Sequence, residues 1–235
     1  MKFKKKKILI LTSLQSHHQI FLNKIKNEID YMIIKEKLHI NPKFNSEEKS
    51  FLKNQKLYED QYLKKNKFLK LKQSYLCKNI NEKKNILKAK KFNPDIIIVF
   101  GTRKLNISWI KSFPKKLFNV HRGDPNYFRG LDSEFWSIYH GMYNSLAVCI
   151  HKIATKLDTG DIFSLMKIHL NKKMKLHQLR LIMTLKVVKI FQKLIKMKNI
   201  KLYKQSYKGR YYSTMPSSLK KICEIKFNKK CKNLK

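Results

Sequence analysis

Cysteine, glycine and proline are all scarce in this chain. Its 235 residues include 4 cysteines, 6 glycines and 5 prolines, which excludes a collagen-like or a proline-rich disordered chain. The cysteines form no Cys-x-x-Cys pair and have no histidine at ligand spacing; they are Cys77, Cys149, Cys223 and Cys231. We therefore expect neither a disulfide framework nor a zinc site, and no metal cofactor.

Long hydrophobic runs are also lacking. No apolar run approaches the roughly 20 residues that a membrane-spanning helix needs. The basic stretch from Lys2 to Lys7 is followed only by the apolar residues Ile8 to Leu11, which is too short for the apolar region of a signal peptide. With 43% hydrophobic residues, the composition is that of a folded protein. We expect a cytoplasmic protein with no membrane partner.

Acidic residues and arginine are few beside lysine. Lysine and arginine together number 54 against 15 acidic residues, a formal net charge of +39. Such a charge is typical of proteins that bind nucleic acid or another polyanion. Phosphate-binding surfaces usually concentrate charge and favour arginine, whereas these lysines are spread along the whole chain. We favour a coding bias over a selected polyanion partner, and in either case the charge would steer an anionic small substrate.

Short apolar runs alternate with amphipathic segments. The runs predict strands at residues 8–11, 31–34, 95–100, 146–153 and 162–170, and one more strand that ends at His121. Helical spacing predicts helices at 17–28, at 47–75 as one helix or a pair, before Pro94, at 133–142 and at 175–197. This alternation predicts an α/β fold with a doubly wound, mostly parallel sheet and helices on both faces.

The chain length suits one well-cored domain with a short appendage. We expect a catalytic domain over residues 1–200 and a basic C-terminal appendage over residues 201–235 that packs on it. Tyr211 and Tyr212 could stack on nucleic-acid bases, but packing of the tail on the sheet is favoured. Phe135 and Trp136 are interpreted as core residues.

Three polar residues are candidates for chemistry at a carbonyl. Asn119 and His121 stand two apart at the end of a predicted strand, so their side chains project from the same face. Asp158 follows on a loop that turns at Gly160. An amide, an imidazole and a carboxylate can hold a carbonyl oxygen, move a proton and orient the proton carrier. Ligands of such folds bind beyond the carboxyl ends of the strands, where these residues and Gly101 are expected.

The same residues resemble a known family. The segments are Phe118-Asn119-Val120-His121, then Phe128-Arg129-Gly130, and later Leu157-Asp158-Thr159-Gly160-Asp161-Ile162. This pattern resembles the folate-dependent formyltransferase family, which includes methionyl-tRNA formyltransferase and glycinamide ribonucleotide formyltransferase. The resemblance covers roughly residues 93–170, and two linked motifs at family spacing are far more specific than either one alone.

The resemblance implies a role for each candidate. Asn119 would donate a hydrogen bond to the formyl oxygen, and His121 would stabilise the oxyanion or supply a proton. Asp158 would hold the imidazole and help to draw a proton from the attacking amine. The formyl donor would be 10-formyltetrahydrofolate. The assigned donor-binding residues are Gly101, Thr102, Leu105, Thr155 and Lys156, and the assigned acceptor-binding residues are Asp124, Arg129 and Gly130.

The acceptor is less defined than the chemistry. The family's Ser-Leu-Leu-Pro loop is replaced here by Arg122-Gly123-Asp124-Pro125. The residues that follow Asp158 leave little room for the separate C-terminal barrel that the resemblance to methionyl-tRNA formyltransferases would imply. We therefore favour a small-molecule primary amine, an amino sugar or a sugar nucleotide. The alternatives are a methionyl-tRNA formyltransferase-like enzyme or RNA-binding protein with tRNA as partner, and a formyltetrahydrofolate hydrolase.

Two further side-chain roles are left open by the sequence. His17 and His18 could contact substrate, although capping of the first helix is favoured. Arg129 could bind an anionic group or could anchor the turn at Gly130, with neither role preferred.

Overall fold

The structure, a computed structural model, describes residues 5–37, 46–66, 71 and 73–234. Its main sheet has seven strands in the order β3-β2-β1-β4-β5-β7-β8. The parallel strands are β1 (Lys7–Thr12), β2 (Asp30–Glu36), β3 (Ser74–Cys77), β4 (Ile96–Phe100) and β5 (Leu117–His121). β7 (Ala147–Lys152) and β8 (Ile162–Lys167) follow as antiparallel strands at one edge. The predicted mostly parallel α/β sheet is confirmed.

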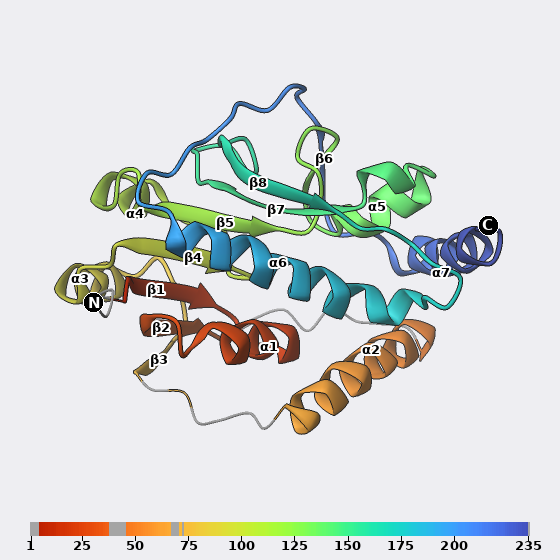
Figure 1. The fold of residues 1–235 in the computed structure, drawn as a ribbon, viewed down its shortest axis with the longest axis horizontal. Helices are drawn as coiled ribbons and strands as arrows, with labels where there is room; N and C mark the ends of the chain where they lie inside the picture. The colour runs from red at the N-terminus through yellow and green to blue at the C-terminus, as the bar shows by residue number, and fades with distance from the viewer. Residues whose placement is uncertain (1–4, 38–45, 67–70, 72, 235) are drawn as a thin grey trace.

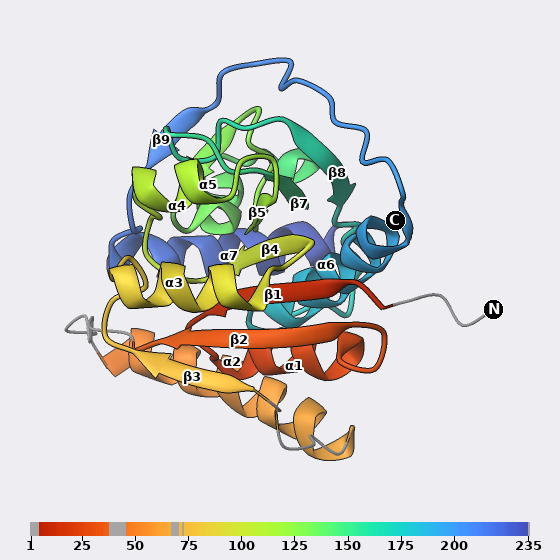
Figure 2. The same cartoon turned by 90° about the vertical axis from the view of Figure 1, so that its left-hand side faces the viewer.

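Helices cover both faces of this sheet because the strand side chains alternate between two apolar layers. Ile8 and Ile10 of β1 pack in the layer of α1 (Ser16–Ile25) and α6 (Leu179–Lys196). Leu9 and Leu11 pack in the layer of α3 (Lys83–Phe92) and α4 (Ile107–Ser112). Figure 1 shows α6 running along the sheet, and Figure 2 shows α3 and α1 on opposite sides of β1 and β2.

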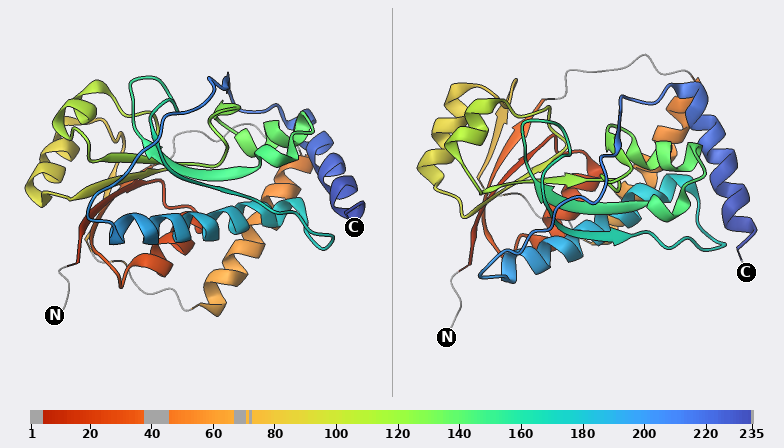
Figure 3. Two further views of the ribbon diagram at one scale, coloured as in Figure 1. Left: turned by 45° about the horizontal axis from the view of Figure 1, so that its top comes forward. Right: turned by 90° about the horizontal axis from the view of Figure 1, so that it is seen from above.

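The C-terminal segment packs against β6 and two helices. β6 (Phe128–Gly130) pairs in parallel with β9 (Arg210–Tyr212) as a separate two-stranded sheet. α7 (Ser217–Lys232) contacts α5 (Ser133–Tyr139) and α2 (Ser46–Lys65), as both views in Figure 3 show. Tyr212 stacks on Trp136 with ring centroids 4.7 Å apart. The tail thus packs on β6, α5 and α2, while the domain division at residue 200 stays a prediction.

The helix prediction for residues 47–75 is wrong at its C-terminal end. α2 stops at Lys65, and Ser74–Cys77 form the edge strand β3 beside β2. Tyr75 and Leu76 of this strand are 40% and 65% exposed. The strand therefore lacks the alternation of apolar and polar residues that marks a half-buried strand, and pairing with β2 decides its conformation. The short helix α4 was not predicted. Two 3-10 turns, η1 (Tyr143–Ser145) and η2 (Leu176–Gln178), complete the described elements.

None of the helices within the described residues is long and apolar enough to cross a membrane.

Candidate active site

β5 and β7 together form the floor of the site. Asn119 and His121 project from β5, and the antiparallel register places His151 of β7 directly opposite Asn119. Cys149 lies opposite His121 and is fully buried. The amide and two imidazoles therefore meet at one point of the sheet, since opposite residues of paired strands have adjacent side chains.

The loop between β7 and β8 brings Asp158 back over these residues. It turns closely against β7: a Cβ atom at Gly160 would lie 1.9 Å from the backbone oxygen of Lys152. Only glycine fits such an approach. Asp158 itself has a positive φ of 50°, a conformation that aspartate adopts more readily than most residues.

The Asp158 carboxylate is buried and saturated with partners. Its Oδ2 atom accepts from the backbone N–H of Gly130 at 2.8 Å and lies 3.4 Å from His121 Nδ1. Its Oδ1 atom accepts from Asn119 Nδ2 at 3.1 Å and lies 3.2 Å from His151 Nε2. Burial by itself would raise the pKa of Asp158, but the positive charge of His121 and these hydrogen bonds outweigh it and hold the pKa well below its usual range. The carboxylate is therefore ionised at neutral pH.

His121 is held at both ring nitrogens. Its Nε2 lies 2.9 Å from the backbone carbonyl of Phe128, and a carbonyl can only accept, so Nε2 carries a proton. Nδ1 faces the Asp158 carboxylate. This geometry suits an imidazolium, because each nitrogen then donates to an oxygen.

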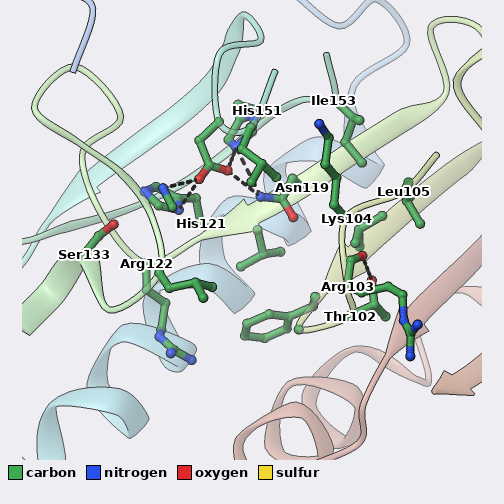
Figure 4. Close-up of a pocket in the computed structure, with 18 of the residues that line it drawn as sticks. Thr102, Arg103, Lys104, Leu105, Asn119, His121, Arg122, Ser133, His151 and Ile153 are labelled. Carbon is green, nitrogen blue, oxygen red and sulfur yellow. Dashed lines mark hydrogen bonds and ion pairs between the residues drawn. The ribbon is translucent and has the colours of Figure 1, made fainter. Parts of the chain in front are cut away.

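Asn119 links the carboxylate to His151. Its amide nitrogen lies 3.3 Å from His151 Nε2 in addition to its bond with Asp158. His151 Nδ1 donates to the backbone oxygen of Lys152 at 2.7 Å, so in the neutral ring Nε2 carries the lone pair and accepts from Asn119. Figure 4 shows the Asn119 amide nitrogen turned towards His151 and its oxygen turned away.

A cavity of about 200 Å³ opens beside these groups. One wall is the irregular segment that follows β4, which includes Gly101 and Leu105, and another is the loop from Ile153 to Asp158. The opposite end is bounded by residues before and within α5, and by Arg122. The catalytic candidates therefore lie between the two ends of one pocket.

A family model described as "Formyl transferase" matches residues 32–194, more than half of the chain. The chain belongs to the formyl transferase family. The predicted family resemblance is thus confirmed.

One relative agrees with the family assignment. A methionyl-tRNA formyltransferase from Finegoldia magna is 33% identical over 103 residues, which cover 43% of this chain and 33% of the relative. The chain thus spans about a third of that relative's length.

Two solved structures share the fold. HypX from Aquifex aeolicus, in complex with tetrahydrofolic acid, has a TM-score of 0.60 at 17% identity, over 92% of this chain and 31% of that one. The formyltransferase PseJ from Anoxybacillus kamchatkensis, in complex with UDP-4,6-dideoxy-4-formamido-L-AltNAc and tetrahydrofolate, has a TM-score of 0.51 at 20% identity, over 88% and 85%. At these identities the likeness establishes the formyl transferase fold.

Most residues predicted from the sequence line the cavity. They are Asn119, His121, Asp158, Gly101, Thr102, Leu105, Lys156 and Gly130. Gly130 contributes through its backbone, because its φ of +91° favours glycine and its N–H donates to Asp158.

Three predicted residues do not line the cavity. Thr155 is exposed beside it. The Asp124 carboxylate accepts from the backbone and side-chain nitrogens of Asn126, which fixes the turn before β6. The buried Arg129 donates to the Pro125 carbonyl and to Gln205 Oε1, so of its two proposed roles the structure supports the anchor. The assignment of Arg129 and Asp124 to acceptor contacts stays a prediction.

His17 and His18 lie behind the pocket. His18 Nδ1 accepts from the backbone N–H of Gln15 at 3.1 Å and so helps to cap α1, as favoured from the sequence. His17 Nε2 lies 3.2 Å from Nη1 of Arg122. The Nε atom of the same arginine donates to Glu134 at 3.0 Å. Burial, reinforced by neighbouring positive charges, lowers the pKa of both histidines well below the usual value, so both are neutral.

Sequence reasoning missed His151, Arg122 and Glu134 as residues of the pocket. One signal for His151 was present in the sequence, because two predicted strands separated by a loop with Gly160 indicate an antiparallel hairpin that contains it. The position of His151 opposite Asn119, however, depends on how this hairpin pairs with the rest of the sheet. Within the described residues, no group of three histidine, cysteine or acidic side chains could hold a metal ion.

Proposed function

We propose that this chain transfers a formyl group from 10-formyltetrahydrofolate to the primary amine of a small molecule, an amino sugar or a sugar nucleotide. The observation that carries the proposal is the meeting of Asn119, His121 and Asp158, from separate parts of the chain, at one pocket. Tetrahydrofolate in the HypX and PseJ structures supports the donor, and the formamido sugar nucleotide in the PseJ structure supports the acceptor class.

The reaction needs stabilisation of an oxyanion. When the amine nitrogen attacks the formyl carbon, the carbonyl oxygen gains negative charge. The Asn119 amide nitrogen has two hydrogens; one can stay on Asp158 while the other turns from His151 to the formyl oxygen. Both ring nitrogens of His121 already face oxygens, so the ring is held in place beside the oxyanion, where its imidazolium form would stabilise the negative charge.

The reaction also needs a base, because the attacking amine must lose a proton. Asp158 is a weak base here, since its pKa is held well below the usual range. The turn of Asn119 towards the formyl oxygen would free the Nε2 lone pair of His151, which lines the same cavity. His151 therefore takes the proton, and Asp158, 3.2 Å away, stabilises the resulting imidazolium. Collapse of the tetrahedral intermediate breaks its bond to the folate nitrogen, which takes the proton from the His151 imidazolium and leaves as tetrahydrofolate.

Mass spectrometry tests the proposal directly. The protein is incubated with 10-formyltetrahydrofolate and a panel of amino sugars, amino sugar nucleotides and methionyl-tRNA, and each amine is examined for the gain of one formyl unit. Formylation of a small amine that is lost in the Asn119→Ala variant is the expected result. Release of tetrahydrofolate without any amine would instead identify a hydrolase, and formylation of methionyl-tRNA alone would identify a tRNA enzyme.

A further inference from the structure

One wall of the pocket has no regular secondary structure of its own. Residues 101–106, which follow β4 and precede α4, form an irregular segment. Gly101 to Leu105 line the cavity, at the end assigned to the folate donor. A wall of this kind keeps its shape only if other parts of the chain hold it.

A buried carboxylate holds the middle of this segment. Glu36, the last residue of β2, is 3% exposed. Its Oε2 accepts from the backbone N–H of Arg103 at 3.0 Å, and its Oε1 forms an ion pair with Arg103 Nε at 2.5 Å. Oε1 also accepts from the backbone N–H of Ile80 at 2.9 Å. One carboxylate thus joins the pocket wall to the turn of residues 78–82 between β3 and α3.

An asparagine in that turn holds the end of the segment. Asn81 Nδ2 donates to the Lys104 carbonyl at 3.0 Å, and Asn81 Oδ1 accepts from the backbone N–H of Asn106 at 2.9 Å. Its amide therefore bridges two backbone positions of the wall, in the way that a neighbouring strand would. The buried Trp109 of α4 adds a third link, because its Nε1 donates to the Ile80 carbonyl at 3.1 Å.

We propose that Glu36 and Asn81 are positioning residues for the folate donor, which they serve through the backbone of residues 101–106 without lining the cavity. This inference rests on the proposed function. Preorganisation of a binding wall raises affinity because ligand binding then need not order the chain. Loss of either residue leaves backbone groups without partners and loosens the wall, while the triad, which stands on β5 and the Asp158 loop, keeps its own contacts.

Binding of tetrahydrofolate, measured by isothermal titration calorimetry, tests this inference. For Glu36→Gln and Asn81→Ala we expect the dissociation constant to rise on the order of tenfold, the effect of about one lost charge-assisted or bridging hydrogen bond. Asn81→Asp keeps the acceptor for Asn106 but sets a carboxylate oxygen against the Lys104 carbonyl oxygen, so its dissociation constant should rise at least as far as that of Asn81→Ala.

The matched control is Glu59→Gln. Glu59 is also a buried carboxylate, and it forms a two-bond ion pair with an arginine, Arg180, but it lies in α2. This variant should lose thermal stability as Glu36→Gln does and yet bind tetrahydrofolate as the wild type does. In turnover assays the KM for the formyl donor should rise in the Glu36 and Asn81 variants, with kcat and the KM of the acceptor within about twofold.

The outcomes separate two failures. If the wild type binds tetrahydrofolate and the folded Asn81→Ala variant binds it equally well, the positioning role is wrong and the proposed function stands. If the wild type itself does not bind tetrahydrofolate, the proposed function is overturned together with the inference. Asn81 is only half-buried, so its variant remains informative even if Glu36→Gln does not fold.

Discussion

Replacement of Asp158 by asparagine tests the central contact of the site with almost no change of shape. Four nitrogen atoms surround the carboxylate: the Gly130 backbone nitrogen at 2.8 Å, Asn119 Nδ2 at 3.1 Å, His151 Nε2 at 3.2 Å and His121 Nδ1 at 3.4 Å. An asparagine side chain has one oxygen and one NH2 group. One orientation turns the NH2 group towards the Gly130 N–H and His121 Nδ1, and the other turns it towards Asn119 Nδ2. Either orientation therefore sets the NH2 group against at least one donor that the carboxylate satisfied.

The expected cost follows from these contacts. A buried donor left without an acceptor costs about 1–3 kcal/mol, and loss of the negative charge beside His121 adds to this cost, so the substitution should cost about 3 kcal/mol at pH 7. For a chain of this length, 1 kcal/mol lowers Tm by about 2–4 °C, so Asp158→Asn should unfold about 6–12 °C below the wild type. Asp161→Asn, an exposed aspartate of the same loop, is the control and should leave Tm unchanged.

The pH dependence of this difference has a definite sign. Burial would raise the pKa of Asp158, but its partners lower it by more, so the pKa is depressed in the folded chain. The contribution of Asp158 to stability is therefore complete above the unfolded aspartate pKa of about 3.9. The contribution is lost as pH falls from there through the folded pKa. The gap in Tm between wild type and Asp158→Asn should therefore stay constant from pH 7 to about pH 5.

Thermal unfolding followed by circular dichroism at a fixed scan rate measures both quantities. Equal Tm values for wild type and Asp158→Asn at pH 7 would refute the four-partner geometry. A gap that closed between pH 7 and pH 5 would show that the stabilisation depends on a group other than this carboxylate.

Three other variants test separate parts of the site. Asn119→Ala should reduce kcat on the order of a hundredfold or more with a smaller change in Tm, as expected for loss of an oxyanion donor; full activity in both Asn119→Ala and His121→Ala would contradict the catalytic assignment. Gly101→Ala should lower Tm by several degrees, because φ is +78° and the new Cβ would lie 2.5 Å from a ring carbon of His18; an unchanged Tm would show that the ring can move aside. The pKa of His17 is lowered by burial, so the wild type should lose stability as pH falls below the unfolded histidine pKa of about 6.5; His17→Gln should lose less between pH 7 and pH 5 in the same unfolding assay, and parallel profiles would contradict this.

The local sequence pattern was enough to predict a strand whose residues are all buried. The β-branched run at residues 95–100 predicted β4, because only a strand covered on both faces by helices tolerates such a run. The spacing of Asn119 and His121 predicted that they share a face, because strand side chains alternate. By contrast, the sequence predicts a helix where β3 lies, since the exposed residues of β3 carry no strand pattern and its pairing partner lies far away in the chain.

The amino-acid sequence by itself determined the fold class, the family and the three catalytic candidates, because periodicity and motif spacing are local properties of the chain. Only the tertiary structure decided which groups touch. It placed His151 opposite Asn119 and Glu36 behind the pocket wall. It also brought Arg129 to Gln205 and Asp124 to Asn126. Such contacts depend on strand register and loop closure, which are fixed by packing between segments distant in sequence, and no local pattern encodes them.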